Sequence, residues 1–263
     1  MSSANATTLR ATALRVAALT HVGQRRYSNE DCIAVGSYIR TEPMTAPLVS
    51  VLRLESPCVC LVADGMGGHP AGDVASRIAI EHLSAELPRS VADDASLVAA
   101  VRDANQLLFA AMESAPAIVG MGTTIAGIAA TANGVAVFNV GDSRVYRARH
   151  GELQQISIDD SVAIFSRFGV LDFPARALSQ CLGGHPGADD IVPHVMREPA
   201  EANCEYLICS DGLHDMLSDD EIAACLSADL QDSVRLLFDR AMAEGGIDNI
   251  SIILARLESG EDA

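Results

Sequence analysis

Apolar residues recur along the chain with two different periods. Short apolar runs bounded by polar residues predict strands at 14–19, 58–63, 206–209 and 249–257, and weaker alternation predicts two more at 32–39 and 48–54. A stripe with helical spacing runs through 94–112. An Ala-rich segment that Asp73 would cap predicts another helix over 73–87.

The middle of the chain, residues 115–141, has no charged side chain and is long enough to span a bilayer. It also contains Pro116, five glycines and the pair Asn133-Gly134, which is a strong hairpin signal. We therefore interpret it as a buried strand, a tight turn and a second strand. Further turns at 141–142 and 150–151 predict a β-meander over 123–131, 135–140, 143–149 and 152–156.

The last third of the chain predicts a second block of helices. Ser218 and Glu221 have the spacing of a capping box, and Gly245-Gly246 would end a helix over 231–244. Residues 161–180 are irregular and favour a short helix and a flap. Strands outnumber helices, which indicates an α+β sandwich with helices outside the sheets. No linker divides the chain, so we expect a disordered tail at 1–13, one domain over 14–257 and a C-terminal tail at 258–263.

Composition and charge exclude several classes of function. The 263 residues carry 18 Lys+Arg against 35 Asp+Glu, a net charge of −17. Such acidity argues against binding nucleic acid or an anionic membrane surface. Hydrophobic residues make up 49% and charged residues 20%, which excludes a disordered chain. Aromatic residues are only 4%, so base-stacking platforms are not expected either.

The seven cysteines are odd in number and form no CxxC pair. Residues 1–20 contain no unbroken apolar stretch of the kind found in secretory signals. Reduced thiols in a cytoplasmic protein are the expectation.

Aspartates follow four apolar runs directly, beside Gly, Asn or Ser. They are Asp64, Asp142, Asp211 and Asp248, and the acidic pair Glu30-Asp31 precedes another expected strand. Any one of these aspartates alone is typical of a turn. Carboxylates at several rigid strand ends can instead converge on one rim, where they repel unless cations lie among them. Oxygen ligands with few histidines favour magnesium or manganese over zinc.

At these positions the chain resembles the metal-dependent serine/threonine protein phosphatases of the PPM (type 2C) family in their bacterial form. The matching blocks occur in the family's order and lie at 23–31 (GQRRYSNED), 62–73 (VADGMGGHPAGD), 122–124 (GTT), 139–144 (NVGDSR), 209–215 (CSDGLHD) and 248–251 (DNIS). The resemblance implies a four-layer αββα sandwich, in which two antiparallel sheets lie between helix pairs. It also implies hydrolysis of phosphoserine and phosphothreonine on proteins by a hydroxide held between two metals.

The resemblance also implies roles for individual residues. Asp64 would bridge two Mn²⁺ or Mg²⁺ ions, the Gly65 carbonyl would bind one of them, and Asp211 and Asp248 would hold the other. Asp31 would contact the site through metal-bound water. Glu30 would do the same, and Asn249 and His69 would lie beside the ligands.

Arg26 stands where the family places its phosphate-binding arginine, because a guanidinium fork matches two phosphate oxygens. Its neighbour Arg25 is interpreted as a surface charge. Asp142 and Asp215, with Asp211, match a weaker third metal site of some members. Asp142 is equally compatible with a structural acceptor in its turn.

Several positions depart from the family pattern. Met66 stands where some members have a proton-donating histidine, and His69 either lies near the site or packs its loop. Asp159-Asp160-Ser161 replaces the usual Asp-His-Ser, the flap over 162–179 is short, and 40–57 reads as an added loop.

The partners expected from the resemblance are phosphorylated proteins, namely a bacterial Ser/Thr kinase and its substrates, and we expect a monomer. A catalytically silent phosphoprotein-binding relative is the alternative, which loss of a metal aspartate would mark. A third interpretation is a phosphatase of the same fold that acts on phosphorylated regulators of sigma factors.

Overall fold

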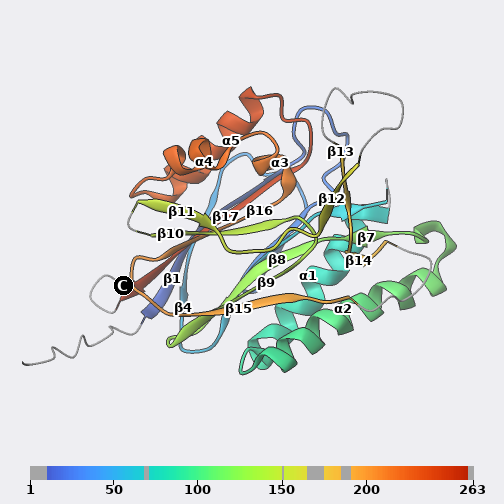
Figure 1. Ribbon diagram of the computed structural model, residues 1–263, viewed down its shortest axis with the longest axis horizontal. Helices are drawn as coiled ribbons and strands as arrows, with labels where there is room; N and C mark the ends of the chain where they lie inside the picture. Colours follow the sequence, from blue (N-terminus) through green and yellow to red (C-terminus); the bar gives the residue numbers. More distant parts are fainter. Residues whose placement is uncertain (1–10, 68–70, 150, 165–174, 185–190, 260–263) are drawn as a thin grey trace, which may run out of the picture.

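Two six-stranded antiparallel sheets pack face to face in the computed structural model, which describes residues 11–67, 71–149, 151–164, 175–184 and 191–259 (Figure 1). The first sheet has the order β11 (Glu152–Gln155), β10 (Arg144–Arg149), β16 (Glu205–Cys209), β17 (Ile250–Ser259), β1 (Ala11–His21), β4 (Leu48–Arg53). The second has the order β15 (His194–Pro199), β9 (Gly134–Val140), β8 (Ile125–Ala130), β5 (Cys58–Ala63), β2 (Cys32–Val35), β3 (Tyr38–Arg40).

Helices cover the outer face of each sheet (Figure 1). The pair α1 (Ala71–Ser90) and α2 (Asp94–Ser114) packs on the second sheet and leads into the short helix η1 (Pro116–Ile118). The helices α3 (Asp211–His214), α4 (Asp219–Cys225) and α5 (Leu230–Ala243) pack on the first sheet. The predicted α+β four-layer sandwich is therefore confirmed.

The alternation of side chains along the strands builds three hydrophobic layers. On β17, Ile252 and Leu254 face the helices, whereas Ile253 and Ala255 lie between the sheets. Both faces of the central strands are thus buried, which explains why they read as continuous apolar runs.

The predicted β-meander is wrong in one respect, because its four strands divide between the two sheets. β8 and β9 belong to the second sheet and β10 and β11 to the first. The chain changes sheets at Gly141, whose φ of 101° suits glycine and whose hypothetical Cβ would lie 2.7 Å from Thr124 Cγ2. Periodicity alone indicates the faces of a strand and not its neighbours.

Other boundaries differ from the predictions for local reasons. Asp73 lies in the first turn of α1 instead of capping it, and α1 continues to Ser90 through Pro88. A third of the expected added loop at 40–57 is strand β4, which pairs with β1. The described parts of 161–180 contain β12 (Ser161–Ile164) and β13 (Ala175–Leu178), which pair antiparallel, and the stretch between them, where the expected short helix would fall, lies outside the described residues. β1 and β17 extend beyond the expected domain limits of 14 and 257.

Three short strands, β6 (Gly65–Met66), β7 (Gly122–Thr123) and β14 (Leu182–Gly183), join into a small sheet. The capping box at Ser218 and Glu221 is confirmed. Within the described ranges, no helix is both long and apolar enough to cross a bilayer.

Candidate active site

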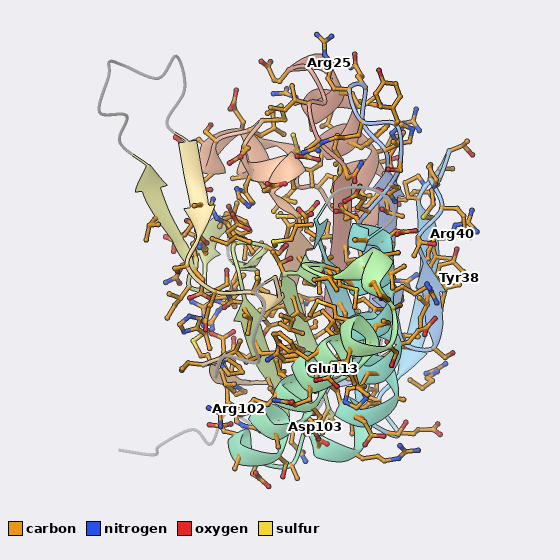
Figure 2. The ribbon with its side chains drawn as sticks, turned by 90° about the vertical axis from the view of Figure 1, so that its right-hand side faces the viewer. Arg25, Tyr38, Arg40, Arg102, Asp103 and Glu113 are labelled. Atoms are coloured by element: carbon orange, nitrogen blue, oxygen red, sulfur yellow. The ribbon has the colours of Figure 1, made fainter. Side chains whose placement is uncertain are left out.

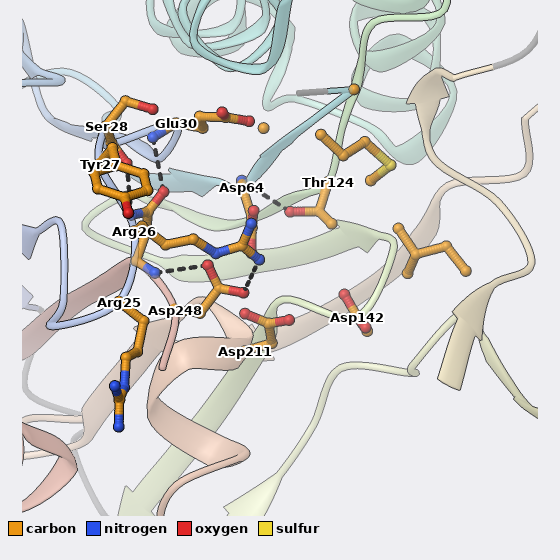
Figure 3. Close-up of a pocket in the computed structure, with 15 residues that line it drawn as sticks. Arg25, Arg26, Tyr27, Ser28, Glu30, Asp64, Thr124, Asp142, Asp211 and Asp248 are labelled. Carbon is orange, nitrogen blue, oxygen red and sulfur yellow. Dashed lines mark hydrogen bonds and ion pairs between the residues drawn. The ribbon is translucent and has the colours of Figure 1, made fainter. Parts of the chain in front are cut away.

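A cavity of about 880 Å³ opens where strand ends of both sheets meet (Figure 3). Its walls come from the loop after β1, the end of β5, the β9–β10 turn, the start of α3 and the turn before β17. The lining residues are Arg25, Arg26, Tyr27, Ser28, Glu30, Asp64, Gly65, Met66, Gly67, Thr124, Asp142, Leu178, Asp211, Asp248 and Asn249. The expected convergence of strand-end carboxylates is therefore observed.

Threonines from the neighbouring segment fix the backbone of Asp64. The Asp64 amide donates to Thr124 Oγ1 at 3.0 Å, and the Asp64 carbonyl accepts from the Thr124 amide and from Thr123 Oγ1, each at 2.9 Å. Thr124 Oγ1 also lies 2.7 Å from Ser143 Oγ. The end of β5 is thus held rigidly, and the Asp64 carboxylate with it.

Gly65 occupies a position that no larger residue could take. A Cβ on it would overlap the carbonyl oxygens of Gly72 and Glu30. The Gly65 amide donates to the Glu30 carbonyl at 3.2 Å, which joins the end of β5 to the acidic pair before β2. The close approach explains the glycine after Asp64.

Asp31 lies fully buried behind the cavity wall. Its Oδ2 accepts from Ser210 Oγ at 2.8 Å and Ser251 Oγ at 2.7 Å, whereas its Oδ1 has no hydrogen-bond partner among the described residues. Burial raises the pKa of Asp31 to about 7, and the charge of Asp248 adds to that effect. The two serine hydroxyls act in the opposite direction.

The carboxylates at the cavity floor disfavour each other's charge. Burial raises the pKa of Asp211 to about 8, followed by the charges of Asp248, Asp142 and Asp31. Burial also raises the pKa of Asp64 well above its usual value, with the charges of Asp31, Asp211 and Asp248 contributing. Asp211 Oδ1, like Asp31 Oδ1, is buried without a partner among the described residues. A bound cation would stabilise the charged form of such a cluster.

Arg26 lies beside Asp248 in the cavity. Its Nη2 donates to Asp248 Oδ2 at 2.6 Å (Figure 3). The Arg26 side chain is more than half exposed, so this ion pair is accessible to solvent.

Asn249 clamps the loop that carries Arg26. Its Nδ2 donates to the carbonyls of Val22 at 3.0 Å and Ser28 at 2.9 Å, and its Oδ1 accepts from the Glu30 amide at 2.8 Å. Asn249 thus sets the shape of the cavity rim, next to Asp248, and its expected place beside metal ligands stays a prediction.

The remaining candidate residues have different surroundings. Asp142 lines the cavity and burial raises its pKa. Asp215 does not line it; its half-exposed carboxylate lies 3.6 Å from His214 Nδ1. His214 Nε2 donates to the Asp142 carbonyl at 3.1 Å. His69 lies outside the described residues.

Sequence reasoning missed several polar residues that hold this site. Ser210 and Ser251 fix Asp31. Asp160 accepts from the Gly141 amide at 2.9 Å, Gln180 Nε2 at 2.7 Å and His194 Nε2 at 2.9 Å, so it ties the Asp142 turn to the base of the flap. The departure from Asp-His-Ser at 159–161 was the available signal for Asp160. All seven cysteines are free, and none lines the cavity.

The donor set fits divalent cations, because it offers oxygen atoms only and includes buried carboxylate oxygens without partners. As the side chains lie, no three or more His, Cys, Asp or Glu within the described ranges form a group that could hold an ion. Asp248 holds Arg26 instead, so cation binding there would require the carboxylate to turn away from the guanidinium.

Comparison with known proteins decides the family. Residues 50–254 match the family model described as protein phosphatase 2C. The chain belongs to the protein phosphatase 2C family. The resemblance seen in the sequence blocks is thereby confirmed.

Relatives in this family are serine/threonine protein phosphatases. PstP of Mycobacterium tuberculosis is 34% identical over 254 residues, which cover 92% of this chain and 45% of PstP. The chain thus spans less than half the length of that relative. The serine/threonine phosphatase stp of Listeria welshimeri is 29% identical over 223 residues, covering 78% of this chain and 88% of stp.

A solved structure of the PstP catalytic domain, in complex with two manganese ions, is also similar. It superposes with a TM-score of 0.72 at 32% identity, covering 94% of this chain and 99% of that domain. The fold is therefore the protein phosphatase 2C fold.

Proposed function

We propose that this chain is a metal-dependent phosphatase acting on phosphoserine and phosphothreonine in proteins. The observation that supports this most strongly is the buried carboxylate cluster around Asp64 and Asp211, in which Asp248 alone pairs with a cationic side chain among the described residues. A family relative binds two manganese ions in a domain of the same fold.

Each acidic residue has a proposed role toward two Mn²⁺ or Mg²⁺ ions. Asp64, the Gly65 carbonyl, Asp211 and Asp248 would hold these ions. Asp31, held by two serines, and Glu30 orient water at the site. When bound, the two cations neutralise the phosphate dianion and lower the pKa of water, so that hydroxide is supplied at neutral pH.

Arg26 binds two oxygens of the substrate phosphate through its guanidinium fork. In the described structure the guanidinium is held by Asp248, and it would become available to phosphate if that carboxylate bound a cation instead. Met66 lines the cavity where some relatives have histidine, so we assign protonation of the leaving oxygen to water.

Asp142, Asp211 and Asp215 would hold a third, weaker cation. Asp142 faces the cavity, which supports this role, although its carbonyl also serves the turn by accepting from His214.

The proposed partners are phosphorylated proteins, including a Ser/Thr kinase and its substrates, and the proposed setting is a cytoplasmic signalling pathway in which the chain acts as a monomer. A catalytically silent relative would lack a metal aspartate, and Asp64, Asp211 and Asp248 are all present. That alternative is therefore not favoured.

Activity is tested by hydrolysis of an aryl phosphate and of a phosphothreonine peptide, with manganese and with a chelator. We expect phosphate release from both substrates with manganese and none with the chelator. Folded protein that releases no phosphate with manganese or magnesium would overturn the proposal.

A further inference from the structure

The rim of the cavity carries two side chains that the proposed hydrolysis does not use. Arg25 and Tyr27 flank Arg26 on the loop between β1 and β2, and both line the cavity mouth. In Figure 3 they lie on the side opposite Asp142, and Arg25 points away from the acidic floor. We call Arg25 and Tyr27 the rim strip.

The backbone beneath the rim strip is fixed from both sides. The Gln24 amide donates to the Gly246 carbonyl at 2.7 Å, and Asn249 holds the carbonyls of Val22 and Ser28. Gly23 has a φ of 75° and packs too closely on the Asp248 carbonyl to carry a side chain. A surface held this way loses little backbone entropy when a partner binds.

Tyr27 is unusual in its exposure. Of the large apolar side chains that the structure describes, it is the most exposed, whereas Tyr146, Tyr206 and Phe138 are fully buried. The chain has only four tyrosines, six phenylalanines and no tryptophan. An exposed aromatic side chain on a fixed backbone at a cavity mouth is typical of a contact that dominates binding.

Arg25 is available to an external anion. All 18 basic residues of the chain are arginines, and several described ones pair with carboxylates, as Arg26, Arg144 and Arg256 do. Arg25 has no hydrogen-bond or ion-pair partner among the described residues, although the protein carries 35 acids.

We propose that the rim strip is a subsite for the polypeptide next to the phosphorylated residue. Tyr27 packs against an apolar side chain of the substrate, and Arg25 pairs with an acidic one. The strip would thus favour phosphothreonine with apolar and acidic neighbours, even though the overall charge of −17 favours basic partners. This inference rests on the proposed phosphatase function.

The test compares O-phosphothreonine with short phosphothreonine peptides in which Leu, Glu, Lys or Ala is moved through the flanking positions. For Tyr27→Ala, we expect kcat/KM on the best Leu-containing peptide to fall about tenfold more than kcat/KM on O-phosphothreonine. For Arg25→Glu, we expect a preference for Glu over Lys in the peptide to reverse, by roughly threefold in each direction.

Matched controls lie on the β3–β4 edge, away from the cavity. Tyr38→Ala removes another exposed tyrosine, and Arg53→Ala removes another exposed arginine whose side chain has no hydrogen-bond or ion-pair partner among the described residues. Figure 2 shows Tyr38 on that edge, far from Arg25 at the top of the molecule. Both control variants should leave every peptide preference unchanged.

Binding is measured separately, as anisotropy of labelled phosphonate analogues of the same peptides, which cannot be hydrolysed. If the wild type releases no phosphate but binding still weakens in Tyr27→Ala, the subsite stands and the activity proposal fails. If Tyr27→Ala weakens neither peptide binding nor peptide turnover more than Tyr38→Ala, the subsite is refuted. Equal losses on O-phosphothreonine and on the peptides would also refute it, because the residue would then act on the phosphate site itself.

Discussion

Two groups of buried or partly buried aspartates have opposite surroundings in this molecule. Asp159 accepts from Arg144 at 2.7 and 3.0 Å, and Asp160 accepts from a backbone amide, Gln180 and His194. At the cavity, Asp211 on the floor and Asp31 behind the wall each keep a buried oxygen without a partner among the described residues. Carboxylates that accept hydrogen bonds from protein donors stabilise a fold. A cluster of carboxylates that lacks such donors is suited to binding a cation.

The largest effect should come from the unpartnered group. Asp211→Asn removes a proposed ligand while keeping the shape of the side chain, and kcat should fall by about 10³-fold or more. Without metal, the same variant should have a higher thermal midpoint than the wild type, because a repelling charge is gone. Activity assays and thermal melts in chelator measure the two effects.

Asp103→Asn, an exposed change on α2, is the control and should alter neither quantity (Figure 2). A variant Asp211→Asn that melted earlier than the wild type in chelator would show that the carboxylate is structural, and the comparison between the two groups would fail.

The partnered group should show the reverse behaviour. Asp159→Ala leaves the partly buried Arg144 without its carboxylate, and we expect a loss of about 3 kcal/mol in the free energy of unfolding. The thermal midpoint should fall by roughly 6–12 °C. The activity that remains should still depend on manganese, because no proposed ligand has changed.

The exposed pair Arg235 and Asp239 on α5 is the matched control, since Asp239→Ala should cost about 1 kcal/mol or less. Urea unfolding of both variants gives the two free energies. Equal costs for the two variants would contradict the structural role of Asp159.

Stability should fall with rising pH when metal is absent and should lose this dependence when metal is bound. The pKa values of Asp31 and Asp211, about 7 and 8, exceed the unfolded value of 3.8, so the folded state holds more protons between these limits. The free energy of unfolding in chelator should therefore fall as pH rises from 4 to 8.

Saturating manganese should remove this fall, because cations replace the protons. At a concentration one hundred times its dissociation constant it should add about 2.7 kcal/mol of stability. Urea unfolding at several pH values, in chelator and in manganese, tests both statements. A free energy that rose with pH in chelator would show that these carboxylates are stabilised by partners within the protein.

The elements and the acids could be predicted because both are local. The apolar run 58–63 coincides with β5, since polar residues bound it on both sides, and the acids at the ends of such runs do line one cavity. The sheet to which β10 belongs could not be predicted, because the alternation shows which residues face inward but not which strand lies beside them.

The serines around Asp31 could not be predicted for the same reason. Ser210 and Ser251 look like ordinary turn and strand residues until β16 and β17 pair, which brings both hydroxyls to one carboxylate. The ion pair of Arg26 with Asp248 also depends on tertiary structure, because these residues are 222 positions apart.

Asp31 combines both kinds of surroundings, because its Oδ2 has hydrogen-bond partners and its Oδ1 has none among the described residues. It therefore tests whether a carboxylate with partners can still serve the metal site. Ser251→Ala removes one of the two hydroxyl donors and loosens the carboxylate without removing it. We expect the manganese concentration for half-maximal activity to rise about tenfold, while KM for substrate changes little. Ser233→Ala, which removes a buried hydroxyl on α5 far from the cavity lining, should leave that concentration unchanged. An unchanged manganese requirement in Ser251→Ala would mean that Asp31 stabilises the fold, as Asp159 and Asp160 do. Asp31 would then belong with the structural aspartates and not with the metal site.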